Sequence, residues 1–229
     1  MKSLERFWAI LRLKTEIFHC DIIVVNVMSK NNINIAVFVS GGGTNLQALI
    51  DKQKSGVIKS GTIKLVVSNN PQAYALERAE TAGIKTVVVS KKDCASQREF
   101  EEKLIEALNE NEIDLIALAG FMCILSEYFT AKYPKRIINV HPSLIPSFCG
   151  KGFYGLHVHE AALKYGVKVT GATVHFVNEI PDGGEIIMQK AIEVEDGDTP
   201  QVLQKRVMVN AEWIILPQAV EKVCRSMLE

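Results

Sequence analysis

An asparagine and a histidine stand two residues apart in the stretch INVHPSLIPSF, which runs from Ile138 to Phe148. In extended backbone, side chains two apart point the same way, so Asn139 and His141 can reach one reacting group. An amide can polarise a carbonyl oxygen or hold a developing oxyanion, and an imidazole can pass a proton near neutral pH. A packed histidine and a turn-forming asparagine would explain the same residues without chemistry, so this motif does not decide alone.

Consecutive glycines mark a second candidate site, in the stretch SGGGTNLQAL from Ser40 to Leu49. Glycines let the backbone turn tightly, and the N-terminus of a following helix offers free N–H groups to an anion. Leu46 replaces the last glycine of the dinucleotide fingerprint, the next strand ends without an acidic residue, and the GK[ST] of a P-loop is missing. We therefore predict that a single phosphate binds at Gly43, Thr44 and Asn45, in preference to a tight turn without function.

A carboxylate and three further histidines are weaker candidates. Asp182 lies in IPDGG, where an Asp-Gly turn needs no function. If this loop meets the strand end at His141, the carboxylate would orient the imidazole and raise its pKa. His157 and His159 have the spacing of a metal-binding pair but no accompanying ligands, so we predict no metal. His175 lies in an alternating strand pattern and is expected to pack on one face.

The elements that must position these residues form an alternating pattern that begins at Ile33. Brief β-branched runs without polar alternation are typical of buried parallel strands. Such strands, joined by helical crossovers, form an open sheet with helices on both faces. Strands are predicted at INIAVFVS, TIKLVVSNN, IKTVVVS, IDLIALAG and RIINV, and helices at 44–54, at 72–83 and from the capping box at 96–99.

The pattern changes after the fifth predicted strand. VKVTGATVHFV and EIIMQKAIEVE predict two longer strands around the loop NEIPDGG. A closing helix should begin at Thr199 and Pro200 and be kinked or interrupted at Pro217. The fold class is therefore α/β, a Rossmann-like, open and mostly parallel twisted sheet with a C-terminal β-rich portion and a closing helix. We expect one domain over residues 31–229 and an N-terminal extension over residues 1–30.

Composition and cysteine usage restrict the class of protein. The 26 basic and 26 acidic residues cancel, which argues against a broad nucleic-acid or membrane surface. The apolar runs of the first thirty residues, such as Ile22 to Val25, are too short to cross a bilayer. The 5 scattered cysteines lack the spacing of a zinc site and favour a reduced compartment. We expect a cytoplasmic protein, monomer or homodimer, whose partners are small molecules.

Taken together, the motifs SGGGTNLQALI, AGFMCILS, NVHPSLIPSF and GATVHFVNEIPDGG resemble the phosphoribosylglycinamide formyltransferase family. N-x-HPSL-x-P is shared by folate-dependent formyltransferases in general, and the glycine-rich loop narrows the resemblance to the glycinamide ribonucleotide enzymes. The resemblance runs from about Asn34 to the C-terminus. It implies direct transfer of a formyl group from 10-formyltetrahydrofolate, as co-substrate, to the amine of N1-(5-phospho-D-ribosyl)glycinamide in purine biosynthesis, through a tetrahedral intermediate and without a metal.

The resemblance also implies a role for each matched residue. Asn139 would polarise the formyl oxygen, and His141 would donate a proton and help hold the intermediate. Asp182 would raise the pKa of His141 and help shuttle protons through water. The ribonucleotide would be held by Gly43, Thr44 and Asn45 at its phosphate and by Glu212 at its ribose hydroxyls. The folate pocket would be lined by Arg98, Met122, Cys123, Ile124, Leu125, Asn139, Asn178, Glu179, Ile180, Pro181 and Asp182.

One position departs from the family pattern, and rival functions compete. Cys123 stands where many members carry arginine, which matters only if that side chain contacts the folate. The main alternative is a formyltetrahydrofolate hydrolase, which has no reason to keep the phosphate loop and usually carries an N-terminal regulatory domain larger than thirty residues can build. A methionyl-tRNA formyltransferase would need a basic RNA-binding domain. A non-catalytic nucleotide-binding module could lose Asn139, His141 and Asp182.

Overall fold

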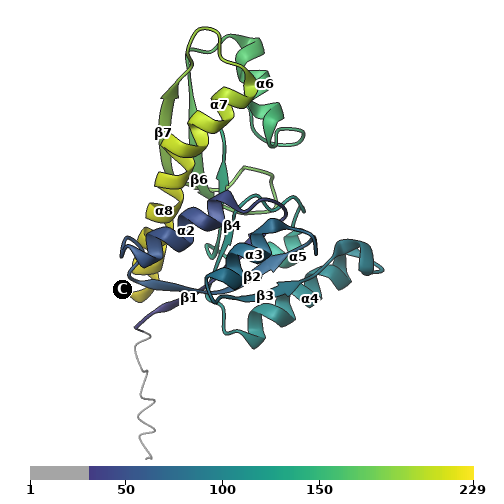
Figure 1. The fold of residues 1–229 in the computed structure, drawn as a ribbon. Helices are drawn as coiled ribbons and strands as arrows, with labels where there is room; N and C mark the ends of the chain where they lie inside the picture. The colour runs from purple at the N-terminus through teal and green to yellow at the C-terminus, as the bar shows by residue number, and fades with distance from the viewer. Residues whose placement is uncertain (1–30) are drawn as a thin grey trace, which may run out of the picture.

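One seven-stranded sheet organises the chain, in the order β3-β2-β1-β4-β5-β6-β7 (Figure 1). The computed structural model describes residues 31–229, so the predicted extension over residues 1–30 lies outside the described residues. Strands β1 to β5 pair in parallel, and β6 and β7 are added antiparallel. The predicted α/β fold class is confirmed. The strands are β1 (Ile33–Val39), β2 (Gly61–Ser68), β3 (Lys85–Val88), β4 (Leu115–Leu118), β5 (Ile137–His141), β6 (Val169–Phe176) and β7 (Ile186–Glu193).

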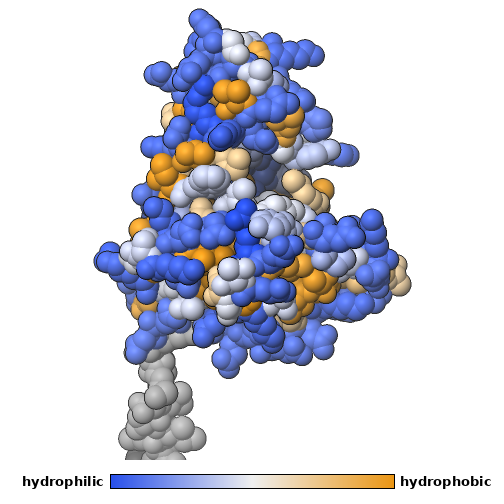
Figure 2. All heavy atoms as spheres, viewed as in Figure 1, coloured by the Kyte–Doolittle hydropathy of each residue, from blue (hydrophilic) through white to orange (hydrophobic). Residues whose placement is uncertain are grey.

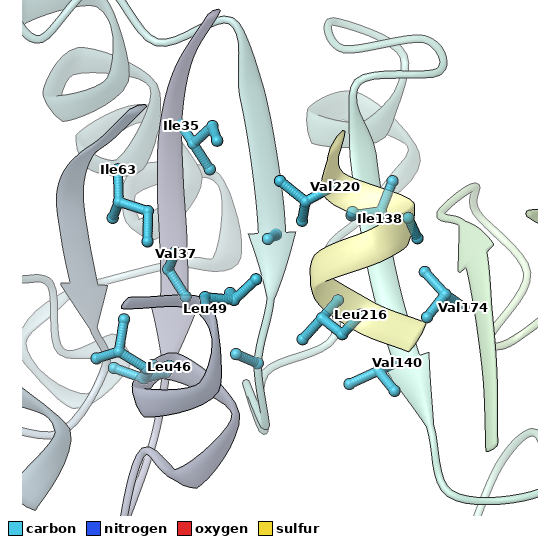
Figure 3. Close-up of a cluster of buried hydrophobic side chains, with 14 of the residues drawn as sticks. Ile35, Val37, Leu46, Leu49, Ile63, Ile138, Val140, Val174, Leu216 and Val220 are labelled. Carbon is cyan, nitrogen blue, oxygen red and sulfur yellow. The ribbon is translucent and has the colours of Figure 1, made fainter. Parts of the chain in front are cut away.

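Helices cover both faces of the sheet because its central strands are apolar on both sides. In β1, Ile35 and Val37 join one buried cluster, whereas Ala36 and Phe38 join the other. Side chains of α2, α3, α7 and α8 complete the first cluster, part of which Figure 3 shows, and those of α4 and α5 complete the second. The helices are α2 (Thr44–Lys54), α3 (Tyr74–Thr81), α4 (Gln97–Glu110), α5 (Glu127–Thr130), α6 (Leu156–Tyr165), α7 (Pro200–Val207) and α8 (Trp213–Leu228).

Several helix ends follow the sequence signals closely. The Ser96 hydroxyl accepts a hydrogen bond from the Glu99 N–H at 3.1 Å, as a capping box requires. The Thr199 hydroxyl caps α7 through the N–H of Val202 at 3.3 Å, with a proline in the first turn. Gly83 follows α3 with a φ of 72°, the left-handed conformation that ends helices.

The closing helix is interrupted before its proline rather than at it. Between α7 and α8 lies a π-helical segment, η2 (Met208–Glu212), and α8 then runs through Pro217 without a break. The prediction that Pro217 interrupts the helix is therefore wrong in position. Pro217 is the fifth residue of α8 and lies inside the helix, where it lacks the N–H that would bond back to the Trp213 carbonyl.

The antiparallel strands extend the molecule beyond its parallel part. Figure 1 shows β6, β7, α6 and α7 in an upper lobe above the helices that surround β1 to β4. Polar residues cover most of the face seen in Figure 2, and apolar residues there lie in separate patches. Within residues 31–229, no helix is both long enough and apolar enough to span a membrane.

Candidate active site

The predicted site residues follow three neighbouring parallel strands. The glycine-rich loop follows β1, the segment Phe121–Ser126 follows β4, and Asn139 and His141 lie at the end of β5. The order of these strands is β1-β4-β5, so their carboxyl ends share one edge of the sheet. The Met122 N–H donates to the Ser40 hydroxyl at 2.8 Å and ties the first two segments together. Ligands of open α/β sheets bind at this edge.

The antiparallel pairing of β5 with β6 brings a third polar residue to Asn139 and His141. Asn139 lies opposite His175 in the register, and its amide nitrogen is 3.2 Å from Nε2 of that ring. His141 is 4% exposed and His175 is 1% exposed, while Asn139 is half-buried. Both imidazoles are thus shielded from solvent, and the amide remains accessible from the edge.

Asp182 joins this group from the loop between β6 and β7. Its Oδ2 lies 3.5 Å from Nδ1 of His141, and its Oδ1 lies 3.5 Å from Nε2 of His175. The Gly150 N–H donates to the same carboxylate at 2.8 Å. Asp182 has a φ of 57°, and a Cβ on the next-but-one residue, Gly184, would lie 1.8 Å from a carbonyl oxygen. The tight, glycine-dependent loop holds the carboxylate against both rings.

His175 is the member of this cluster that sequence reasoning missed. Its burial agrees with the expected packing on one face, but its ring contacts both Asn139 and Asp182. Its Nδ1 lies 2.8 Å from the Phe176 carbonyl oxygen, which leaves Nε2 for the site. The signal that could have found it is the β5–β6 register, which a strand pattern alone does not give.

Burial and the neighbouring carboxylate act in opposite directions on the pKa of His141. Burial lowers the pKa of His141 below its ordinary value, and the Asp182 carboxylate partly opposes this effect. Nε2 of His141 lies 2.8 Å from the Phe148 carbonyl oxygen, while Nδ1 faces the carboxylate. Because both neighbours are acceptors, only the protonated ring satisfies both. Burial would raise the pKa of Asp182, but its contacts with His175, His141 and the Gly150 N–H lower it below the ordinary value.

The glycine-rich loop is shaped by α3, against which it packs. The Gly41 carbonyl accepts from the Ala75 N–H at 3.0 Å, and the Gly42 carbonyl accepts from Nε of Arg78 at 2.8 Å. Gly43 precedes α2 with a φ of 71°. The loop carbonyls are thereby engaged by α3, and the first N–H groups of α2 have no intrahelical acceptor, as at any helix start. This geometry suits an anion.

A buried carboxylate lies beside the start of α2. Glu212, in η2, is 8% exposed and accepts a hydrogen bond from the Asn45 amide at 2.7 Å. Burial raises the pKa of Glu212, and the bond from Asn45 opposes that rise. The Asn45 Oδ1 is buried and has no hydrogen-bond partner within the described chain. The pair can accept and donate hydrogen bonds to hydroxyl groups of a ligand.

A cavity at the same edge contains most of the predicted folate residues. Its lining includes Cys123, Ile124, Leu125, Asn139, Asn178, Glu179, Ile180, Pro181 and Asp182, together with His175. Met122 and Arg98 lie outside this lining. Met122 is 60% exposed on the adjacent surface. Arg98 pairs with Glu102 at 2.7 Å and stacks on the Tyr128 ring, 3.2 Å from its centroid.

His157 and His159 are not grouped with further metal ligands in the described part of the chain. His157 is exposed and lies 2.9 Å from Glu160, whereas His159 is fully buried and neither of its ring nitrogens has a hydrogen-bond partner in the described chain. Over residues 31–229, no three His, Cys, Asp or Glu side chains are grouped so that they could hold a metal ion.

Comparisons with known proteins agree with this geometry. The pattern of the family described as formyl transferase matches residues 33–220. The phosphoribosylglycinamide formyltransferase of Escherichia coli (strain K12) is 40% identical over 188 residues, which cover 82% of this chain and 85% of that protein. The human trifunctional purine biosynthetic protein adenosine-3 is 43% identical over 87% of this chain, which spans only 19% of that protein's length.

Solved structures lead to the same family. Glycinamide ribonucleotide transformylase 1 from Symbiobacterium toebii superimposes with a TM-score of 0.80 at 38% identity, covering 86% of this chain and 90% of that one. The phosphoribosylglycinamide formyltransferase from Brucella melitensis gives a TM-score of 0.77 at 41% identity, covering 84% and 96%. The chain therefore belongs to the formyl transferase family, among the phosphoribosylglycinamide formyltransferases.

Proposed function

We propose that this protein transfers a formyl group from 10-formyltetrahydrofolate to the amine of N1-(5-phospho-D-ribosyl)glycinamide, a step of purine biosynthesis. The observation that carries the proposal is the convergence of Asn139, His141 and Asp182 at one sheet edge, next to a loop shaped for an anion. Family membership supports the reaction class. The E. coli relative, which this chain covers over 85% of its length, supports the acceptor.

The acceptor amine attacks the formyl carbon and forms a tetrahedral intermediate. The Asn139 amide donates a hydrogen bond to the formyl oxygen, which becomes an oxyanion as the new C–N bond forms. The Nε2–H of His141 leaves the Phe148 carbonyl and donates instead to this oxyanion, which the new hydrogen bond stabilises. The bond from carbon to N10 of the folate then breaks. The amine loses one proton, and N10 gains one.

Asp182 keeps a proton available to this step. Its carboxylate faces Nδ1 of His141 and favours the imidazolium against the effect of burial. His175, whose Nδ1 donates to the Phe176 carbonyl, accepts from the Asn139 amide at Nε2 and so fixes the position of that amide. All four side chains are constrained before any substrate binds, and geometry set in advance accounts for much of enzymatic rate enhancement.

The substrates occupy opposite sides of this cluster. The phosphate of the ribonucleotide binds at Gly43, Thr44 and Asn45, and Glu212 accepts hydrogen bonds from the ribose hydroxyls. The pterin of the folate enters the cavity beside Asn139, with Ile124, Leu125 and the loop from Asn178 to Asp182 as its walls. Met122 and Arg98 meet the more exposed part of the folate. No metal takes part, and we retain the prediction of a cytoplasmic monomer or homodimer.

The hydrolase alternative is less well supported. A hydrolase needs the cavity and the Asn139, His141 and Asp182 cluster, but its acceptor is water. It would gain nothing from a phosphate-binding loop, whose carbonyls are engaged by Ala75 and Arg78 and whose N–H groups at the start of α2 are left for an anion.

An assay with and without the acceptor tests the proposal. Purified protein is given 10-formyltetrahydrofolate, and deformylated folate is followed with glycinamide ribonucleotide present or omitted. We expect turnover only with the ribonucleotide, at least a hundredfold loss in His141→Ala, and unchanged turnover in His157→Ala, a control at an exposed histidine. Equal turnover without the ribonucleotide would establish a hydrolase instead.

A further inference from the structure

A buried carboxylate outside the catalytic cluster is not explained by the proposed mechanism. Glu101 lies in α4 and is 0% exposed, between the apolar residues Phe100 and Leu104, which are also fully buried. Burying a carboxylate costs several kcal/mol unless hydrogen bonds replace its water. An apolar residue would pack at this position of α4 without that cost, so the partners of Glu101 indicate why a carboxylate is there.

The partners of Glu101 connect α4 to the end of one short segment, Phe121–Ser126. Oε1 of Glu101 accepts from the Ser126 N–H at 2.7 Å, and Oε2 accepts from the Ser126 hydroxyl at 2.6 Å. Gln97, one turn earlier in α4, donates to Glu101 at 2.6 Å and to the Ile124 carbonyl oxygen at 3.1 Å. Two backbone positions of the segment are thereby fixed from one helix.

This segment depends on such contacts because it has no regular structure of its own. Residues 121–126 lie between β4 and α5 and belong to neither a helix nor a strand. They nevertheless supply three side chains to the cavity wall, those of Cys123, Ile124 and Leu125. Ile124 is 70% exposed, so packing does little to hold it. The hydrogen bonds from α4 therefore hold the Ile124 part of this wall, whereas Leu125 packs in the second buried cluster and Cys123 accepts from the Asn69 amide at 2.9 Å.

We propose that Glu101, together with Gln97, is a positioning residue for the formyl donor. It holds the segment Phe121–Ser126 in the shape that binds the folate, so little ordering is left for the moment of binding. The inference rests on the proposed function only for the identity of the ligand. The main effect that we assign to Glu101 is on donor affinity, because its bonds hold the Ser126 end of the segment. The carbonyls of the glycine-rich loop are held by α3, although Met122 also bonds to Ser40 of that loop.

The variant Glu101→Gln tests this inference with little change in shape. An amide keeps one acceptor oxygen for the N–H groups of Ser126 and Gln97, and its NH₂ group meets the Ser126 hydroxyl, which must turn from donor to acceptor. The charge-assisted hydrogen bonds are lost. We expect the Kd for tetrahydrofolate, measured by calorimetry, to rise about tenfold. The KM for the ribonucleotide and kcat should stay within twofold. Glu106→Gln, an exposed glutamate on the same helix, is the matched control and should change nothing.

A second variant keeps the test decisive if Glu101→Gln folds poorly. Ser126→Ala removes one hydrogen bond to Glu101 and keeps the one from the backbone N–H, so it should weaken tetrahydrofolate binding less, about threefold. Unchanged folate affinity in the folded variants, with only a lower melting temperature, would overturn the inference and make Glu101 a structural residue. Failure of the proposed function is distinguishable, since it would appear as absent formyl transfer by the unaltered protein. Absent tetrahydrofolate binding by the unaltered protein would overturn both.

Discussion

The substitution Gly43→Ala should separate phosphate binding from formyl chemistry. Gly43 has a φ of 71°, and a Cβ at this position would lie 2.6 Å from Cβ and 2.8 Å from Cα of Ala75. Carbon atoms pack best at about 3.5–4.0 Å, so the loop or α3 must move by about 1 Å. Ala75 cannot easily move, because it is a fully buried residue of α3 itself.

The magnitude follows from two contributions. A left-handed conformation costs a non-glycine residue roughly 1–2 kcal/mol. Overpacking a close contact costs about 1–3 kcal/mol more if the loop keeps its shape. If the loop moves instead, its N–H groups leave the phosphate, and a displacement of about 1 Å can cost about a hundredfold in rate. The substitution should therefore lower both the free energy of unfolding and the affinity for the ribonucleotide.

The assay compares Gly43→Ala with Gly41→Ala, where an added Cβ meets nothing within 4 Å and φ is not positive. We expect the Kd for the ribonucleotide to rise at least tenfold in Gly43→Ala and to change less than threefold in Gly41→Ala. Tetrahydrofolate affinity should be unchanged in both. A Gly43→Ala variant that melts and binds ribonucleotide like the unaltered protein would refute the geometry of this loop and its role.

Three further perturbations test charge and access. Asp182→Asn removes the charge that raises the pKa of His141, so the NMR titration midpoint of His141 should fall, and an unchanged midpoint would remove Asp182 from its proposed role. Burial lowers the pKa of His159 to about 4 from 6.5; the neutral ring therefore contributes stability that is complete above pH 6.5 and is lost as pH falls toward 4. Chemical denaturation should show a fall of roughly 3 kcal/mol in the free energy of unfolding over this pH range. The fall should be absent in His159→Phe. The Cys123 thiol lines the cavity, so iodoacetamide should label it more slowly when tetrahydrofolate is bound, as mass spectrometry would detect; equal rates would place the folate elsewhere.

The parallel part of the fold could be predicted because its strands are continuous apolar runs between clear helix signals. Asn139 and His141 could be identified from their spacing at a strand end. The approach of Asp182 to His141 could not, because it depends on the β5–β6 pairing and on a loop with a positive φ at Asp182. His175 was missed for the same reason, since its partner across the sheet is set by register.

Glu101 and the helix interruption show two other limits of sequence patterns. Glu101 lies beside the buried positions 100, 104 and 108 of α4, and the sequence pattern does not single it out, because glutamates at such positions are mostly exposed. The interruption was expected at Pro217, the residue with a known local effect, and occurs at η2 instead. Residues of both flanking helices pack in the first buried cluster, and a local sequence pattern does not show how these two helices must be aligned.

The π-helical segment η2 fixes how many residues separate the buried positions of α7 from those of α8. The buried residues Leu203, Val207, Ala211 and Ile215 follow at intervals of four. Each interval turns an α-helix by about 400°, so three intervals would rotate the apolar stripe by about 120° away from the sheet. A wider turn at η2 takes up part of this rotation. Deleting one residue from 208–211 would leave eleven residue steps between the first and last of these positions, which an uninterrupted α-helix turns by about 1100°, only about 20° past whole turns. The apolar stripe would then stay in phase without the π turn, and Glu212, which lies in that turn, would move relative to Asn45. The number of residues in this segment therefore places Glu212 within hydrogen-bond distance of Asn45.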